Sequence, residues 1–526
     1  MSEPEQSSFL VPHDLDVDRL ARLLGGPARC RVDGNAVFEL DFYDSFDWRL
    51  HQAGLRLLRV ASGADAVLRL KDAAGAEVVE PVAHPPRPAW PAELPDGPLR
   101  ARVTNALEMR VLLPVVRVEC RVTELAVLDE DAKTVVRLQW LAMQCRSDAV
   151  KEARRLWPRV RLLPVRGYED VLEALEHDLA DGQEWPRAPG CLFDEALAAV
   201  GREAGDYSSK LEIALQPGMP ALDAMRRVLL TLLDTLERNV DGTRADLDSE
   251  FLHDLRVATR RTRSALGQVK QVLPDAVVAD FRERFGWLGQ VTGPTRDLDV
   301  FLLELPHYRA SLPRAMADDL APLETHLRAL HAREQKRLRR ELGSERMSSL
   351  LRGWRSVLEQ GEATGQPGWF ADLPVERVAA SRIWKMYRKV RKAGRHAARH
   401  GSAEDLHELR KDCKKLRYLI EFFRSLYPAD EIKGLVRALK DLLDDLGDFQ
   451  DLQVQADRLR EFAAALDRAD RDNLSAVLGI GALVADLLRR QAAARDAFAG
   501  LFEAFEADEN RERYRRLFKA QGAGLG

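Results

Sequence analysis

The chain has 526 residues, of which 46% are hydrophobic and 31% are charged, and its formal net charge is −4. This length exceeds that of one ordinary domain, so we expect two or three domains in a globular protein. No segment approaches the roughly 20 consecutive apolar residues of a membrane-spanning helix, so we expect no membrane partner. The five cysteines form no Cys-x-x-Cys pair. Their scatter argues against a disulfide framework or a zinc site and favours a reducing, cytoplasmic compartment.

Charge is divided unevenly along the chain. Residues 1–200 contain 25 Lys and Arg residues against 33 Asp and Glu residues, whereas residues 201–526 contain 55 against 51. Neither part is basic enough to bind nucleic acid through bulk charge alone. If the chain binds an anion, we therefore expect a local cluster of cationic side chains to hold it.

The first 200 residues show the pattern of a β-rich domain. Short runs rich in Val, Leu and aromatic residues recur over residues 9–145, and stretches rich in Pro and Gly separate them. The segment GQEWPRAPG at 182–190 is predicted to be a linker. We therefore expect an α+β multidomain protein whose domain 1–200 is an antiparallel β tunnel or barrel with a few helices. Those helices are predicted at 16–24, 98–107 and 168–179.

Residues 201–526 are predicted to be helical almost without interruption, because Ala, Leu, Arg and Glu dominate and apolar residues recur every three or four positions. Similarity at a constant offset of 154 residues divides this domain into repeats at about 210–365 and 366–520. We therefore expect an all-α domain of duplicated four-helix bundles. The predicted helices cover 220–239, 249–271, 276–292, 295–304, 313–341 and 345–362 in the first repeat, and 375–400, 403–425, 430–446, 449–469, 472–498 and 501–518 in the second.

One predicted helix of each repeat carries a row of four cationic or imidazole side chains at spacings of three, four and three. In an α-helix this spacing places all four within an arc of roughly 80° on one face. We call the two rows the first and the second stripe. The first stripe consists of His253, Arg256, Arg260 and Arg263, and the second of His407, Arg410, Lys414 and Arg417.

Two further patterns accompany the stripes. The motif GPTRDLDV at 293–300 is followed 154 residues later by GDFQDLQV at 447–454. The helix predicted at 375–400 also places cationic side chains on one face by the same spacing rule, and these are Arg382, Lys385, Lys389, Lys392 and His396.

A solvated surface with ion pairs to acidic neighbours is the ordinary explanation of such a stripe. Against it, Asp and Glu are nearly absent from the His253 face, and the same composition recurs in the second repeat. If the stripes face one another, their unpaired cations repel and need a counter-anion. Arg and Lys side chains in a linear array suit a polyanion of repeated phosphates. Nucleic acid is less favoured, because the stripes carry no aromatic side chains for base stacking.

The segments HDLRVATRRTRSAL, RDLDV and HELRKDCKKLRYL, in this order and spacing, closely resemble the CHAD domain. The resemblance covers about residues 210–520. It implies two four-helix bundles around a basic cavity or pore that binds inorganic polyphosphate, without known catalytic activity. We therefore expect a cytoplasmic polyphosphate-binding protein that associates with polyphosphate granules. By position, the resemblance nominates both stripes, and we add Lys385, Lys389 and Lys392 of the third helix with Arg261 and Lys415 as outlying members.

CHAD domains often follow a CYTH domain, the triphosphate-tunnel fold that hydrolyses tripolyphosphate or related substrates with a divalent metal. Residues 9–180 are similar to a distant member of that family. The basic wall of such a tunnel would survive in part, in Arg56, Lys71, Arg117 and Arg121. The segments that carry the resemblance are FLVP at 9–12, YDSFD at 43–47, GLR at 54–56, LRLK at 68–71, LDE at 128–130 and GYE at 167–169.

The metal-binding residues of that family are not matched. Its opening signature, ExExK, aligns with Pro4, Gln6 and Ser8. Arg137 and Gln139 stand where an acidic strand is expected, and a hard divalent cation needs several anionic oxygen ligands. We therefore predict a tunnel fold that has lost hydrolysis, with no catalytic residue, no metal ligand and no cofactor. The alternatives are a tripolyphosphatase that uses Mg²⁺ or Mn²⁺ in the tunnel, and a scaffold that binds RNA or a protein partner.

Overall fold

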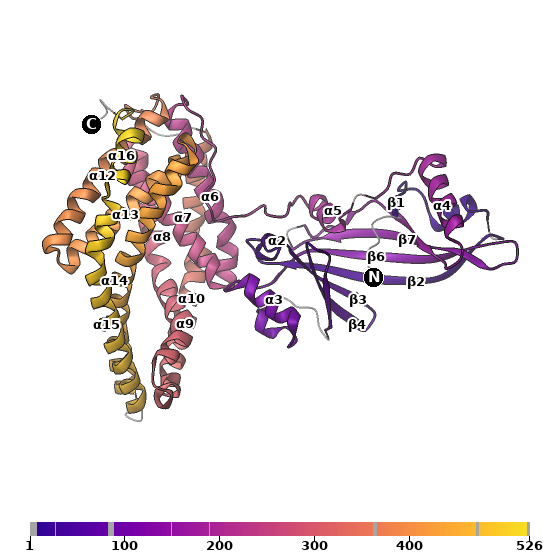
Figure 1. The fold of residues 1–526 in the computed structure, drawn as a ribbon, viewed down its shortest axis with the longest axis horizontal. Coiled ribbons are helices and arrows are strands. Elements are labelled where there is room, and N and C mark those ends of the chain that lie inside the picture. The colour runs from indigo at the N-terminus through magenta and orange to yellow at the C-terminus, as the bar shows by residue number, and fades with distance from the viewer. Residues whose placement is uncertain are drawn as a thin grey trace. The chain divides into compact units, whose positions relative to one another are not determined.

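The computed structural model describes residues 8–26, 28–82, 89–148, 150–188, 190–360, 366–469 and 473–522. The chain forms two compact units, residues 1–208 and 209–526 (Figure 1). The first unit is built on an antiparallel sheet and the second is helical, which confirms the mixed fold class. None of the helices in the described ranges combines the length and the apolarity that a membrane crossing requires.

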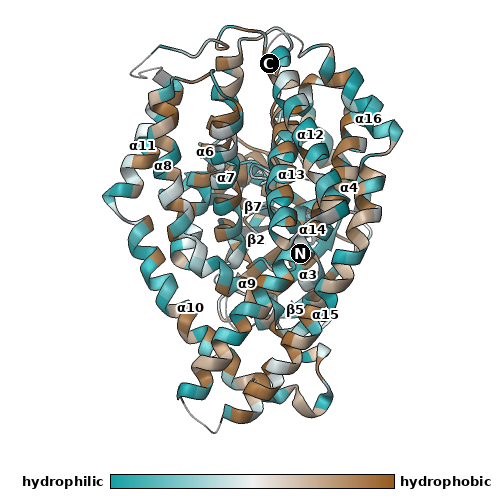
Figure 2. Ribbon diagram, turned by 90° about the vertical axis from the view of Figure 1, so that its left-hand side faces the viewer, coloured by the Kyte–Doolittle hydropathy of each residue, from teal (hydrophilic) through white to brown (hydrophobic). Residues whose placement is uncertain are grey.

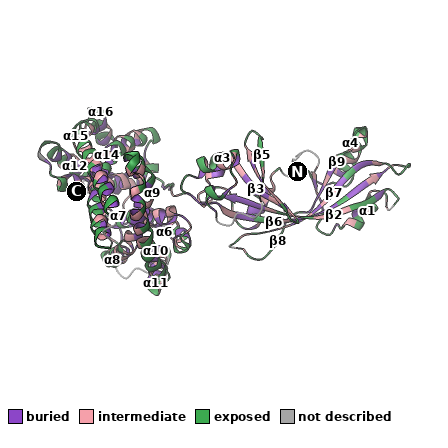
Figure 3. Cartoon of the chain, turned by 90° about the horizontal axis from the view of Figure 1, so that it is seen from below, coloured by how far each residue is buried: buried purple, intermediate pink, exposed green. Residues whose placement is uncertain are grey.

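The sheet of the first unit has nine strands in the order β1-β9-β7-β6-β2-β3-β4-β5, with β8 paired to β7 outside this path. Buried and exposed side chains alternate along much of the long central strands, because successive residues point to opposite faces (Figure 3). Among the described residues no ladder joins β1 to β5, so backbone hydrogen bonds do not close the sheet into a barrel. The strands are β1 Ser8–Leu10, β2 Cys30–Asp44, β3 Leu55–Ser62, β4 Asp65–Asp72, β5 Glu77–Pro81, β6 Leu113–Leu128, β7 Thr134–Arg146, β8 Arg154–Arg155 and β9 Arg159–Pro164.

Helices cover parts of both faces of this sheet. The helix α3 (Pro98–Leu107) packs its buried residues against leucines of β3 and β4. The helix α5 (Leu192–Ala199) packs Phe193 and its neighbours against β2, β6 and β7. The predicted helices near residues 16, 98 and 168 are confirmed as α1 (Val17–Leu23), α3 and α4 (Glu169–His177), whereas α5 and the short α2 (Arg49–Gln52) were not predicted.

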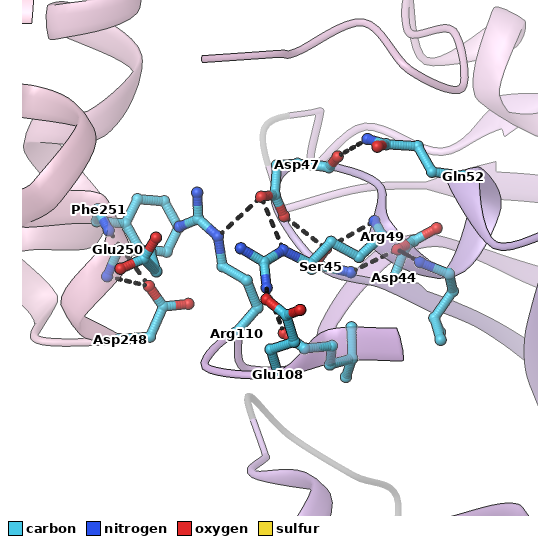
Figure 4. A network of polar contacts seen from close by, with 12 residues as sticks. Asp44, Ser45, Asp47, Arg49, Gln52, Glu108, Arg110, Asp248, Glu250 and Phe251 are labelled. Carbon is cyan, nitrogen blue, oxygen red and sulfur yellow. Dashed lines mark hydrogen bonds and ion pairs between the residues drawn. The ribbon is translucent and has the colours of Figure 1, made fainter. Parts of the chain in front are cut away.

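A buried polar turn joins β2 to β3 (Figure 4). Its centre is Asp44, which accepts hydrogen bonds from the backbone N–H groups of Ser45, Leu50 and His51 at 2.7, 2.9 and 2.9 Å. Burial raises the pKa of the Asp44 carboxyl to about 6. The motif YDSFD thus has a clear structural function, because one carboxylate holds the start of α2 in place.

The helical unit consists of eleven described α-helices and short connecting turns. The helices α6 and α12 begin at residues 221 and 375, and α7 and α13 begin at residues 249 and 403, so both pairs keep the offset of 154 residues. The α-helices are α6 Ala221–Ala245, α7 Ser249–Gln268, α8 Asp275–Val291, α9 Gly293–Ser311, α10 Ala321–Leu342, α11 Glu345–Gln360, α12 Val375–His400, α13 Ala403–Phe423, α14 Ala429–Ala469, α15 Leu474–Phe505 and α16 Asp508–Tyr514.

Two predicted helix boundaries are wrong. The helices predicted at 430–446 and 449–469 form one continuous helix, α14, and the prediction ended the helix at 498 whereas α15 continues to Phe505. The corresponding segment of the first half is interrupted at Thr292, between α8 and α9. Pro294 lies in the first turn of α9 and lacks a backbone N–H, so the helical hydrogen bonds cannot run through. The second half has Asp448 at this position and imposes no such break.

The apolar core of the helical unit does not separate into two bundles. One cluster contains residues of α6, α7 and α8 together with residues of α12, α13 and α14. A second cluster joins α9 and α10 to α14 and α15. Figure 2 shows the alternation of hydrophilic and hydrophobic residues along these helices that amphipathic packing requires. The two halves are therefore held together through shared cores.

Side-chain caps fix the first turn of both helices that carry a stripe. The Asp248 carboxylate accepts hydrogen bonds from the backbone N–H groups of Glu250 and Phe251, at 3.0 and 3.2 Å, at the start of α7 (Figure 4). At the start of α13, Ser402 and Asp405 form a reciprocal capping box. Such caps typically stabilise a helix by about 1 kcal/mol. They set the residue at which each stripe begins.

Candidate anion-binding groove

A groove of about 760 Å³ lies between α7, α8 and α13. Side chains of the first stripe line one side of it, and side chains from the helix of the second stripe line the other. Glu283 is the only acidic residue among the described residues that line it. The cationic residues that line the groove are Arg260, Arg263, Arg282, Lys411, Lys414 and Lys415.

Three of these cations have no partner. Among the described residues, Arg260, Arg263 and Lys414 make no hydrogen bond and no ion pair. They come from both α7 and α13, so positive charge from the two stripes meets in one groove. Uncompensated like charges at close range raise the free energy of the empty groove, and an anion would lower it.

The electrostatic environment of Lys414 reflects this excess of positive charge. Burial, followed by the positive charges of Arg410 and Arg260, lowers the pKa of the Lys414 ammonium from 10.5 to about 8. Arg260 belongs to the other stripe, so the two stripes act on the same side chain. Burial also lowers the pKa of the Arg256 guanidinium.

The N-terminal part of the first stripe contacts the polar motif at 293–300 and the helix before it. Arg256 donates hydrogen bonds to the backbone oxygen of Gly289 at 3.3 Å and to Thr292 Oγ1 at 3.1 Å. His253 Nδ1 lies 2.9 Å from a guanidinium nitrogen of Arg296. These contacts hold the side chains in place against α8 and α9.

The second stripe makes corresponding contacts at the same offset, but with more negative charge. His407 Nδ1 contacts Gln450 Oε1, where Gln450 takes the place of Arg296. Arg410 donates two hydrogen bonds to the carboxylate of Asp451, at 3.0 and 2.9 Å. The two stripes are therefore related in position but different in charge balance, because Arg410 is neutralised and Arg260 is not.

The structure places Arg417 away from the rest of its stripe. Arg417 and Arg261 both pair with Glu421, at 2.7 and 3.1 Å, and both line a different cavity of about 1230 Å³. This cavity also contains residues 210–214 and the start of α14. The two arginines are thus engaged by a shared carboxylate.

The lysines of the third helix are also outside the groove. Lys389 on α12 pairs with Asp412 at 2.9 Å, and Lys415 pairs with the same carboxylate at 2.8 Å. Lys385 and Lys392 are exposed on α12. Of these lysines, Lys415 alone lines the groove in the described part of the chain.

Several groove residues were not predicted from the sequence. Arg282 lies on α8, where no cationic periodicity marks it. Lys411 lies beside the second stripe and pairs with Glu408. Tyr418 and Gln268 complete the lining at positions that the spacing rule does not select. Their proximity depends on how α7, α8 and α13 pack, which helical periodicity does not specify.

The four basic residues assigned to a tunnel wall in the first unit do not form one wall. Arg56 is directly opposite Lys71 in the ladder between β3 and β4. Arg117 is opposite Asp41, and Arg121 is opposite Val37, in the ladder between β2 and β6. Because Leu58 is opposite Phe42 in the ladder of β2 and β3, alternation puts Arg56 and Lys71 on one face of the sheet and Arg117 and Arg121 on the other.

The positions discussed for metal binding give the following picture. Pro4 and Gln6 lie outside the described residues, and Ser8 begins β1. Arg137 and Gln139 lie on β7, and Gln139 donates a hydrogen bond to Glu124 at 3.1 Å. Within the described residues, no three His, Cys, Asp or Glu side chains are grouped so that they could hold a metal ion.

Comparison with known families identifies the helical unit. The model of the CHAD domain family matches residues 227–460, which include both stripes and the groove. The second unit therefore contains a CHAD domain.

The chain is similar to two uncharacterized proteins of Mycobacterium tuberculosis, from strains CDC 1551 and H37Rv. Each is 28% identical over 314 residues, which is 56% of this chain and 57% of the relative. The match thus spans little more than half the length of these relatives. Among solved structures, the CHAD domain from the plant Ricinus communis is 23% identical, with a TM-score of 0.47 over 56% of this chain and 96% of that chain. PptA from Streptomyces chartreusis is 18% identical, with a TM-score of 0.44 over 54% of this chain and 99% of that chain.

Proposed function

We propose that the protein binds inorganic polyphosphate in the groove between α7, α8 and α13. The observation that carries this proposal is the set of three unpartnered cations, Arg260, Arg263 and Lys414, contributed by two helices to one groove. Each charge-assisted hydrogen bond to a phosphate oxygen contributes roughly 1.5–3 kcal/mol. A chain of phosphates can satisfy several such cations at once, whereas a single small anion cannot.

The proposal includes the origin of the groove and the nature of the first unit. We propose that the two halves of the helical unit descend from one duplicated bundle, which the helix offset of 154 residues supports. The first unit is proposed to be a degenerate triphosphate-tunnel domain without metal-dependent hydrolysis, supported by its antiparallel sheet and by Arg137 in place of a carboxylate. Such a protein would act in the cytoplasm, at polyphosphate granules.

The test of the function is equilibrium binding of the full chain to long-chain polyphosphate over a series of salt concentrations. We expect saturable binding whose logarithmic affinity falls linearly with the logarithm of salt concentration, as counterions are released from the polyanion. RNA at equal phosphate concentration should fail to displace the polyphosphate. Absence of binding at low salt, or complete displacement by RNA, would contradict the proposal. Phosphate release from tripolyphosphate with Mg²⁺ or Mn²⁺ would instead support the tripolyphosphatase.

Polyphosphate affinity should fall as the pH rises above about 8. In the empty groove Lys414 loses its proton near this pH, whereas a bound anion favours the charged ammonium, so binding at pH 9 takes up a proton. Titration calorimetry in buffers of different ionisation enthalpy measures this uptake. Lys414→Arg should remove most of the pH dependence, because a guanidinium stays charged. An unchanged pH profile in that variant would assign the proton to another group.

Stability should show the linked effect of Lys414. The unfolded chain keeps the Lys414 proton up to about pH 10.5, whereas the folded chain releases it near pH 8. Between these values the unfolded state binds more protons, so this residue makes the fold more stable as the pH rises through that window. The anion affinity and the contribution of Lys414 to stability therefore change with pH in opposite directions.

A further inference from the structure

A second cavity, of about 290 Å³, lies in the first unit on the sheet face that carries Arg56 and Lys71. Its floor consists of apolar side chains from β2 and β3, and α5 contributes Leu192 and Phe193 to its lining. This volume is at the lower end of the range in which proteins hold small organic ligands. The residues of the floor are Phe38, Leu40, Phe42, Leu58 and Val60.

The cationic side chains of this cavity are not neutralised. Arg56 and Lys71 are directly opposite each other in the ladder of β3 and β4, a position in which like charges are unfavourable. Neither makes a hydrogen bond or an ion pair within the part of the chain that the structure describes. The one acidic lining residue found there, Glu77, pairs with Arg69 at 3.6 Å. Two positive charges therefore remain beside the cavity without a carboxylate of their own.

The apolar floor is incompletely covered. Leu40, Leu58 and Val60 are only partly buried, although they lie beside buried core residues of the same sheet. The guanidinium of Arg56 lies 5.2 Å from the centre of the Phe193 ring, so this aromatic side chain holds the cation at the edge of the floor. Apolar surface and unpaired cations thus meet at one place.

We propose that this cavity binds a small amphipathic anion, with a carboxylate or phosphate head on Arg56 and Lys71 and an apolar body on the floor of β2 and β3. A head group of one or two negative charges would neutralise the two cations. The apolar body would cover Leu40, Leu58 and Val60 and gain roughly 25 cal/mol for each Å² removed from water. A triphosphate fits less well, because an apolar floor cannot replace the water around its outer phosphates.

Calorimetric titration of the full chain with decanoate, decyl phosphate, acetate and tripolyphosphate tests this proposal. We expect decanoate and decyl phosphate to bind with one site per chain, and acetate to bind at least tenfold more weakly because it lacks the apolar body. Decanoate against decyl phosphate decides which head group is preferred. If neither binds saturably, or if tripolyphosphate binds more tightly than both, the proposal is wrong.

Matched variants locate the site. The variant Arg56→Gln/Lys71→Gln should weaken decyl phosphate binding at least tenfold, whereas Arg117→Gln/Arg121→Gln, on the opposite face of the sheet, should leave it unchanged. The single variant Lys71→Gln, a milder change in a half-buried strand, should show part of the loss if the double variant folds poorly. Equal binding by wild type and Arg56→Gln/Lys71→Gln would overturn the assignment. Polyphosphate binding by the helical groove should be unaffected in all three variants, which keeps this proposal separate from the first.

Discussion

Charge reversal at Arg260 and Lys414 should abolish retention of long-chain polyphosphate. The variant Arg260→Glu/Lys414→Glu removes two unpartnered cations from facing helices and puts two carboxylates into the same groove. Two charge-assisted hydrogen bonds of about 1.5–3 kcal/mol each are lost, which corresponds to a loss of affinity of about 100-fold or more. Retention on immobilised polyphosphate at fixed salt, with the dissociation constant from fluorescence titration, measures the effect.

The control for this variant is Arg333→Glu/Lys336→Glu. Both residues are exposed on α10, and neither lines the groove, so the net charge changes equally without a change at the site. We expect its affinity to stay within a few-fold of the wild-type value, because exposed charges are screened by salt. Equal losses in the two double variants would mean that overall charge, and not the groove, holds the polymer. Unchanged helical circular dichroism in both would exclude unfolding as the cause.

Truncation of Trp354 should have the largest effect on stability. Trp354 on α11 is completely buried, and its ring centre lies 4.4 Å from that of Phe281 and 5.8 Å from that of Phe285. Trp354→Ala leaves a cavity among these aromatic side chains and should reduce the free energy of unfolding by about 3–5 kcal/mol. Urea unfolding followed by the helical circular dichroism signal measures this reduction.

Trp369 provides a control of the same residue type. Its side chain is 89% exposed, so Trp369→Ala removes almost no buried surface. The expected change in unfolding free energy is within about 0.5 kcal/mol. If Trp354→Ala cost no more than this control, the aromatic cluster of α8 and α11 would not be closely packed in solution.

Much of the helical architecture could be predicted, because apolar periodicity and the offset of 154 residues are local properties of the chain. The prediction of two helices over 430–469 was wrong for a specific reason. It transferred a break from the first half, where Pro294 removes a backbone donor, to the second half, where Asp448 allows α14 to continue. A duplicated pattern therefore predicts corresponding positions but not identical hydrogen bonding.

The site was less accessible to sequence reasoning than the helices. Spacing alone selected Arg260, Arg263 and Lys414, which line the groove, because residues on one helix face follow the helical period. The same rule also selected Arg410 and Arg417, which the carboxylates of Asp451 and Glu421 neutralise from other turns or helices. Which cations remain free depends on tertiary packing, and no periodicity within one helix contains that information.

The continuous core of the helical unit has a consequence for how this protein can change over time. Leu229 and Leu255 of the first half share one apolar cluster with Ile383 and Leu416 of the second, so each half forms part of the interior of the other. Separation of the halves would expose that interior to water, at a cost proportional to the apolar area uncovered. The halves are therefore one cooperative folding unit, in which surface charges can diverge independently, as those around Arg256 and Arg410 have, whereas core substitutions in one half constrain those in the other.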